Sequence, residues 1–152
     1  MSDRYLYKAK TKCIVDTYNS GKEDGEWVKG YLYCDTGKWV IKQFEYERAD
    51  YIDYEIDPET ICQYTGLIDN SGRKVWENDI IKYHFGDTYA LIKYGGYQSC
   101  FDSRKAEHIG FYADWQGEED LRKDLGYWIN IVDTLVIGNI FDNPELLGGD
   151  MV

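Results

Sequence analysis

Hydrophobic and polar positions alternate along most of the chain, in short runs that turn-forming residues separate. Residues 27–33 and 38–44 alternate in this way on either side of an Asp-Thr-Gly triplet at 35–37, which is typical of two strands joined by a tight turn. The same pattern predicts a strand pair formed by residues 79–85 and 88–94. Strands therefore make up most of the predicted structure.

Turn residues mark a further hairpin in the middle of the chain. Asp69-Asn70-Ser71-Gly72 separates residues 64–68 from residues 73–76, and the glycine is available for the positive φ that many turns require. We expect the two flanking segments to pair as strands.

One helix longer than a single turn is predicted. Leu121, Leu125 and Trp128 recur at helical spacing, which predicts a short helix over residues 118–125. Acidic residues fall in its first turn and basic residues nearer its end, as the helix dipole favours. Gly126 is placed to end this helix.

Single helical turns are predicted where proline follows a capping residue. Pro58 follows Asp57, and Pro144 follows Asn143. Proline fixes φ at a helical value, and the preceding side chain can accept hydrogen bonds from the amides that come next. The second of these turns is expected over residues 144–147.

Together these elements indicate a mostly β fold of the β-rich α+β class. We predict one domain over residues 1–152, with a small bent sheet or SH3-like barrel built around residues 63–94 and short helices. A partly helical segment is inserted at about residues 99–128.

Composition and charge agree with this fold and exclude some functions. Aromatic residues make up 16% of the chain, including 15 Tyr, and such side chains suit half-buried pleated surfaces. The net charge of −11 repels phosphate and anionic lipid, which argues against a protein that coats DNA.

The same sequence indicates a compartment. Residues 1–10 alternate charged with apolar residues, unlike a signal peptide, and no segment approaches the roughly 18 uninterrupted apolar residues of a membrane span. We expect a cytoplasmic protein of the host cell that does not bind membranes. The four cysteines form no close pair, which suits neither zinc nor a redox dithiol, and we expect reduced, mostly buried thiols at Cys13, Cys34, Cys62 and Cys100.

Three segments resemble the YopX family of phage and prophage proteins. They are residues 57–81, DPETICQYTGLIDNSGRKVWENDII, residues 136–147, VIGNIFDNPELL, and residues 25–32. In that family the turn after the QYTGL hairpin commonly reads Glu-Gly-Asp, whereas this chain has Glu77-Asn78-Asp79. Asparagine tolerates left-handed φ almost as glycine does, so we expect the turn to form.

The resemblance, which covers most of residues 25–147, carries expectations of its own. It implies a small intracellular protein of phage origin, rich in β-structure with a barrel-like core, which self-assembles and for which no biochemical activity is agreed. The insertion at about residues 99–128 is longer than the family pattern.

Residues with catalytic potential stand outside recognisable motifs. His84 and His108 have neither a nucleophile nor metal-ligand spacing beside them, so structural roles are favoured. Ser99-Cys100 lacks the Gly-x-Ser-x-Gly elbow of a nucleophile. We therefore expect no enzyme, no catalytic residues and no cofactor.

A metal site is the remaining chemical candidate. Glu77 and Asp79 offer two carboxylates, which without further clustered ligands make a weak oxygen site. Side-chain bonds that stabilise the turn are the favoured role, and we expect no metal.

The acidic residues suggest a partner surface. Residues 45–59 hold seven carboxylates and one arginine. Such a run is most often a solvated face. The alternative is a surface that imitates the charge of DNA and occupies a host nucleic-acid-binding protein, with these candidate residues: Glu45, Glu47, Asp50 and Asp53.

Two modes of action follow. The first is an accessory protein that acts by contact with a host or phage protein, because aromatic residues are common at interfaces. The second is a nucleic-acid-associated regulator that stacks bases on aromatic rings and contacts phosphate through these basic residues: Lys8, Lys10, Lys12, Arg73 and Lys74.

Assembly is the last expectation. Many aromatic residues must be placed in a small domain with open strand edges, which favours a homo-oligomer. We expect the contact on residues 136–147, although this strand could instead complete its own barrel. The candidate interface residues are Trp27, Tyr31, Ile140, Phe141, Leu146 and Leu147.

Overall fold

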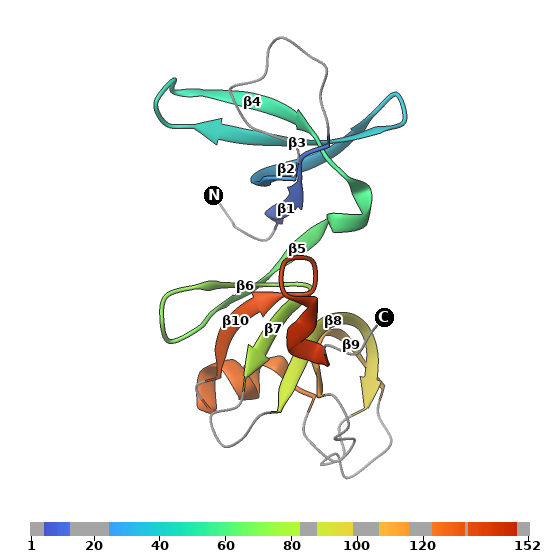
Figure 1. Ribbon diagram of the computed structural model, residues 1–152, viewed down its shortest axis with the longest axis vertical. Coiled ribbons are helices and arrows are strands. Elements are labelled where there is room, and N and C mark those ends of the chain that lie inside the picture. The colour runs from blue at the N-terminus through green and yellow to red at the C-terminus, as the bar shows by residue number, and fades with distance from the viewer. Residues whose placement is uncertain are drawn as a thin grey trace. The chain divides into compact units, whose positions relative to one another are not determined.

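A computed structural model describes residues 5–12, 25–82, 88–98, 107–115, 123–132 and 134–148. These residues form ten strands in two antiparallel sheets with a few short helical turns, which confirms the predicted mostly β class (Figure 1). The chain, expected as one domain, divides into two compact units, Met1–Tyr64 and Thr65–Val152.

The larger sheet has the strand order β4-β3-β2-β1-β5-β6. Its fifth strand begins in the first unit and continues into the second. The bounds of its strands are β1 (Tyr7–Lys10), β2 (Trp27–Asp35), β3 (Lys38–Glu45), β4 (Asp50–Glu55), β5 (Cys62–Ile68) and β6 (Lys74–Trp76).

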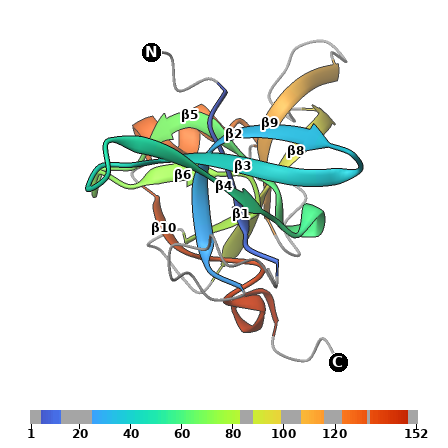
Figure 2. The same ribbon diagram turned by 90° about the horizontal axis from the view of Figure 1, so that it is seen from above.

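The hairpin of β2 and β3 forms as predicted. Asp35 pairs with Lys38, so a two-residue turn joins the strands, and its residues Thr36 and Gly37 have φ values of 48° and 81°. Positive φ at both positions matches the right-handed twist of the strands it connects. Figures 1 and 2 both show β3 lying between β2 and β4.

The first unit buries one face of these strands. Its core holds apolar side chains from β1 to β4 and from the residue that follows β4, namely Ala9, Val28, Ile41, Tyr54 and Ile56. An isolated bridge joins Thr11 to Ile56, and the N–H of Lys12 donates to the carbonyl of Glu55 at 3.0 Å. The bridge brings the ends of β1 and β4 together, yet across the described ranges neither sheet closes into the predicted SH3-like barrel.

The second sheet, of four strands, lies in the second unit. Its order is β10-β7-β8-β9, with β7 (Asp79–Lys82), β8 (Tyr89–Gln98), β9 (Glu107–Trp115) and β10 (Leu135–Asn139). The predicted pair of β7 and β8 is confirmed, with Ile81 opposite Ala90, while residues 83–87 lie outside the described part. The core beneath contains Val75, Ile92, Trp115 and Trp128.

The expectation of one sheet or barrel around residues 63–94 was wrong, because these strands divide between two sheets. The cause is the turn between β6 and β7. The Asp79 carboxylate accepts the Trp76 N–H at 2.8 Å, and the Asn78 N–H donates to Ile92 of β8 at 2.8 Å. The first bond occupies the N–H that Trp76 would donate to β7 in a β6–β7 hairpin, and the second joins the turn to β8. Asn78 has φ of 70°, the left-handed conformation expected of it.

Two single helical turns form where proline predicts them. In η2 (Pro58–Thr60) the Asp57 carboxylate accepts the Glu59 N–H at 3.0 Å, which confirms the predicted cap. In η4 (Pro144–Leu147) Asn143 stands at the cap position, but its side chain accepts the Asn139 N–H instead. No helix within the described ranges is long and apolar enough to cross a membrane.

The predicted end of the longer helix was wrong. Residues 116–122 lie outside the described part, and the observed helical segment η3 (Tyr127–Ile131), a π-helix, follows Gly126 directly. Gly126 keeps a helical φ of −58° and so does not end the turn. Burial of Trp128 and Ile129 in the core favours continuing the helical segment past the glycine.

The cysteines are described at two positions. Cys62 on β5 is buried, as expected, and its thiol donates to the Thr60 carbonyl at 3.3 Å. Cys34 on β2 is exposed, contrary to the expectation, because it lies near the end of the hairpin where the core no longer covers it. Cys13 and Cys100 lie outside the described residues.

Candidate interaction surface

Four aromatic rings lie in a row on the first unit, and we call them the aromatic face: Tyr31 on β2, Phe44 on β3, Tyr51 on β4 and Tyr46 in the turn after β3. The ring centroids are 6.4 Å apart for Tyr31 and Tyr51, 5.1 Å for Tyr51 and Phe44, and 4.9 Å for Phe44 and Tyr46. These spacings and their tilted or edge-to-face angles are those of favourable aromatic pairs.

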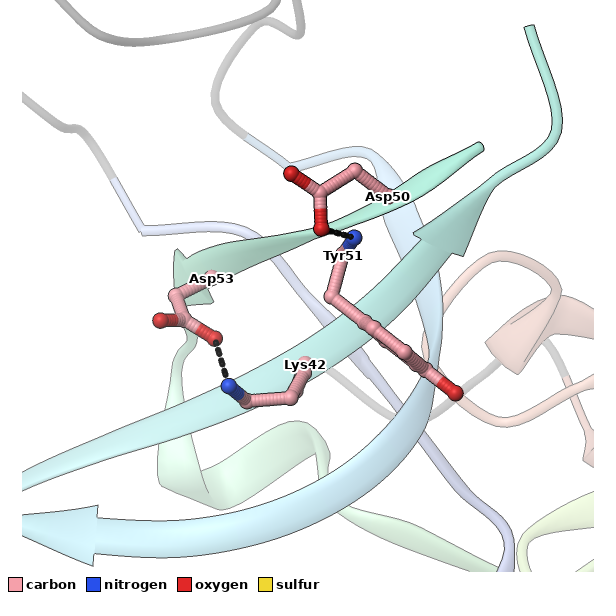
Figure 3. Close-up of polar contacts among 4 residues, drawn as sticks. All are labelled: Lys42, Asp50, Tyr51 and Asp53. Atoms are coloured by element: carbon pink, nitrogen blue, oxygen red, sulfur yellow. Dashed lines mark hydrogen bonds and ion pairs between the residues drawn. The ribbon is translucent and has the colours of Figure 1, made fainter. Parts of the chain in front are cut away.

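Strand alternation places these rings on one side of the sheet. Phe44 is the register partner of Tyr51, so their side chains lie on the same face. Ile41 and Tyr54, also register partners, lie on the opposite face and are fully buried in the core. The rings of Phe44 and Tyr51 are therefore left on the face away from the core, and Figure 3 shows Tyr51 reaching over β3.

Three of the four rings are exposed to solvent. Tyr46 is 87% exposed, Tyr51 43% and Phe44 37%, while Tyr31 is half-buried. Single exposed apolar residues are common on proteins and need no explanation. A row of touching rings is different, because contiguous exposed apolar patches mark binding sites.

The acidic residues of this hairpin divide between the two faces of the sheet. Asp50 and Glu45 are register partners next to Tyr51 and Phe44, so strand alternation places them on the opposite face. Asp53 lies opposite Lys42 and forms an ion pair with it at 3.6 Å (Figure 3). Asp50 accepts the Tyr51 N–H at 2.8 Å, and Glu47 is exposed in the turn. Glu45 instead accepts hydrogen bonds from the Gln43 amide at 2.8 Å and the Tyr54 hydroxyl at 3.0 Å. Three of the four predicted acidic residues therefore lie exposed on this hairpin, and Glu45 is half-buried.

The electrostatics of the face are visible at Tyr33. Burial, together with the charge of Asp53 and a hydrogen bond to it, raises the pKa of the Tyr33 hydroxyl, and the charge of Asp35 adds to the effect. Asp53 and Asp35 therefore lie close enough to Tyr33 to disfavour its ionised form.

Trp27, another of the predicted interface residues, packs against lysines rather than against other aromatic rings. Lys8 and Lys10 place their ammonium groups 4.6 and 5.4 Å from the centre of its ring. Lys8 is only 8% exposed. Two of the lysines predicted to contact phosphate thus pack against an aromatic ring of their own chain.

The other candidates of the sequence serve the framework or lie outside the described part. Asp79 is buried and holds the Trp76 N–H, the turn-stabilising role predicted for it. His108 stacks on Tyr97 with centroids 5.3 Å apart. His84, Ser99 and Cys100 are not described, and in the described ranges no three His, Cys, Asp or Glu side chains gather as a metal site.

Comparison with known protein families adds the identity of the fold. A family model described as YopX protein matches residues 9–148. The chain belongs to the YopX family. No curated protein matches it.

Two of the three segments that carry the YopX resemblance, residues 57–81 and 136–147, bond to each other in the second unit. Asp69, in the hairpin turn, accepts the Val136 N–H at 3.1 Å, and Arg73 donates to the Val136 carbonyl at 3.0 Å. The N–H of Ile140 also donates to the carbonyl of Asn78 at 3.0 Å. The sequence by which the YopX family is recognised thus builds the framework of this unit.

The C-terminal strand of this YopX protein belongs to its own sheet. β10 pairs with β7, with Val136 opposite Ile81 and Asn139 opposite Asp79. This is the alternative in which the strand serves its own fold, although the sheet stays open. The four candidate interface residues that follow are each half-buried: Ile140, Phe141, Leu146 and Leu147.

Of the four rings, only Tyr31 was predicted from the sequence as an interface residue. The signal was present, because Phe44, Tyr46 and Tyr51 alternate with carboxylates in the acidic run. Reading that run for its charge alone concealed the aromatic residues between the acids.

Proposed function

We propose that this YopX-family protein is a phage or prophage accessory protein that acts in the host cytoplasm by binding another protein, without catalysis. The aromatic face is the observation that carries the proposal. Tyrosine and phenylalanine bury much area on binding at little entropic cost, and they are enriched at protein interfaces.

The position of the face supports this mode of action. Its rings stand on a paired sheet, where Phe44 and Tyr51 face each other across β3 and β4, so little ordering remains to be done on binding. Nucleic acid is the weaker candidate, because Glu47 and Asp53 lie exposed beside the rings and the net charge is −11.

Affinity capture tests the proposal. The intact protein is immobilised, host lysate is passed over it, and a retained protein is purified and measured again by calorimetry. We expect binding to be lost in the Tyr46→Ser/Tyr51→Ser variant and kept in Tyr94→Ser, a matched control at an exposed tyrosine of β8. Turnover of a substrate by the protein without any captured partner would overturn the proposal.

A further inference from the structure

We propose that the aromatic face binds the arginine or lysine side chains of an extended basic segment in the partner protein. The inference rests on the proposed function and names the chemistry of its partner. It is carried by the row of exposed rings together with the charge that surrounds them.

The rings offer π faces to a cation. Tyr46, Tyr51 and Phe44 are each at least partly exposed to solvent. The ring centroid of Phe44 lies 4.9 Å from that of Tyr46 and 5.1 Å from that of Tyr51. Arginine stacks on such rings through its planar guanidinium, and lysine places its ammonium over the ring. The same chain already shows the second arrangement at Trp27, beneath Lys8 and Lys10.

The charge around the rings selects a cation. Residues 44–55 contain five carboxylates and one arginine. Asp53 and Glu55 alternate with Tyr51 on the same face of β4, and Glu47 is exposed in the turn. Asp53 lies beside the row, and its ion pair with Lys42 is close to half-exposed on both sides. Because such exposed pairs contribute little stability, an arginine of the partner can replace Lys42 there at little cost.

The same charge disfavours the other occupants. Phosphate groups of nucleic acid or of anionic lipid would meet carboxylates at this face. A second copy of the chain, docked by the same face, would bring the exposed Glu47 and Asp53 of both copies to one interface, and close like charges are unfavourable there.

The spacing of the rings suggests the form of the segment. Residues that point to the same side of an extended chain are about 7 Å apart. The centroids of Tyr31 and Tyr51 are 6.4 Å apart. Basic residues two positions apart on an extended segment would therefore match the separation of Tyr31 and Tyr51.

A labelled peptide of alternating serine and arginine is the probe, with fluorescence anisotropy as the measurement. We expect saturable binding to the intact protein and about tenfold weaker binding to Tyr46→Ser/Tyr51→Ser, because two cation–ring contacts are removed. Tyr94→Ser is the aromatic control and should bind like the parent protein. Circular dichroism confirms that each variant is folded.

Charge is tested separately. Glu47→Gln/Asp53→Asn should weaken binding several-fold and reduce its dependence on salt, whereas Glu145→Gln, an exposed carboxylate of η4, should leave both unchanged. Equal loss in every carboxylate variant, with no effect of the ring substitutions, would show general attraction to an acidic protein and would overturn the inference.

The outcome is distinguishable from that of the proposed function. The arginine peptide could fail to displace a partner that is captured through the aromatic face. That result would overturn the inference of a basic segment and leave the proposed function standing. Self-association lost in the ring variant would assign the face to a second copy and likewise overturn the inference.

Discussion

Asp69 satisfies backbone groups from two segments that lie far apart in the sequence. One carboxylate oxygen accepts hydrogen bonds from the Ser71 N–H, the Ser71 hydroxyl and the Arg73 N–H, and the other accepts the Val136 N–H. The side chain is 3% exposed. Burial alone would raise its pKa, but the hydrogen bonds from Ser71, Arg73 and Val136 outweigh burial and lower it.

Asp69→Asn is expected to lower the free energy of unfolding by about 2–4 kcal/mol at neutral pH, because buried charge-assisted hydrogen bonds are lost and donors are left without acceptors. Urea unfolding followed by tryptophan fluorescence measures the change. Glu59→Gln, an exposed carboxylate of η2, is the control and should stay within about 0.5 kcal/mol of the parent protein.

The same carboxylate makes stability depend on pH. Because the pKa of Asp69 is lower in the folded state, its contribution is complete above the unfolded value of about 3.9 and is lost as pH falls through the folded value. Urea unfolding at a series of pH values should show the difference between the parent protein and Asp69→Asn shrinking in acid. A difference that stays constant from neutral pH down to pH ~3 would contradict this assignment.

At the scale of the elements, a glycine on β2, Gly30, allows the backbones of β2 and β3 to lie close together. A Cβ added at Gly30 would collide with the backbone carbonyl of Lys42, an atom that cannot swing away. At Gly126 an added Cβ meets nothing within 4 Å, and φ is already helical at −58°.

Gly30→Ala is therefore expected to destabilise the protein by about 2 kcal/mol or more, since β3 must shift to admit the methyl group. Gly126→Ala should be neutral or stabilising by up to about 1 kcal/mol, because alanine favours the helical conformation. Thermal unfolding of both variants beside the parent protein measures the contrast. Equal destabilisation by the two substitutions would show that the register of β2 and β3 is wrong.

The hairpins were predictable because a few consecutive residues of the sequence determine each turn. Thr36-Gly37 and Asp69-Asn70-Ser71-Gly72 give the turns directly. The division into two sheets was not predictable, since the bonds from Trp76 to Asp79 and from Asn78 to Ile92 leave no trace in an alternating pattern. The aromatic face could not be predicted, because it depends on the pairing of Phe44 with Tyr51. The hydrophobic pattern of one strand does not indicate which residue of the next strand lies opposite.

At the scale of the whole molecule, self-association stays a prediction. Static light scattering at micromolar concentration should give a mass above the 17.8 kDa of one chain. At Val136 the outer edge of β10 is already occupied, because Asp69 and Arg73 bond the backbone of this residue. A mass of one chain would remove the assembly hypothesis.

The residues that bond the outer edge of β10 at Val136 are synthesised before β10 itself. The chain is synthesised from its N-terminus, so residues 69–73 leave the ribosome long before Val136 does. When the last strand emerges, the side chains that will bond the N–H and the carbonyl of Val136 already exist in the same molecule. A bare edge strand is a template for joining other nascent chains. Here the interval in which such joining can occur is shortened by the order of the sequence itself.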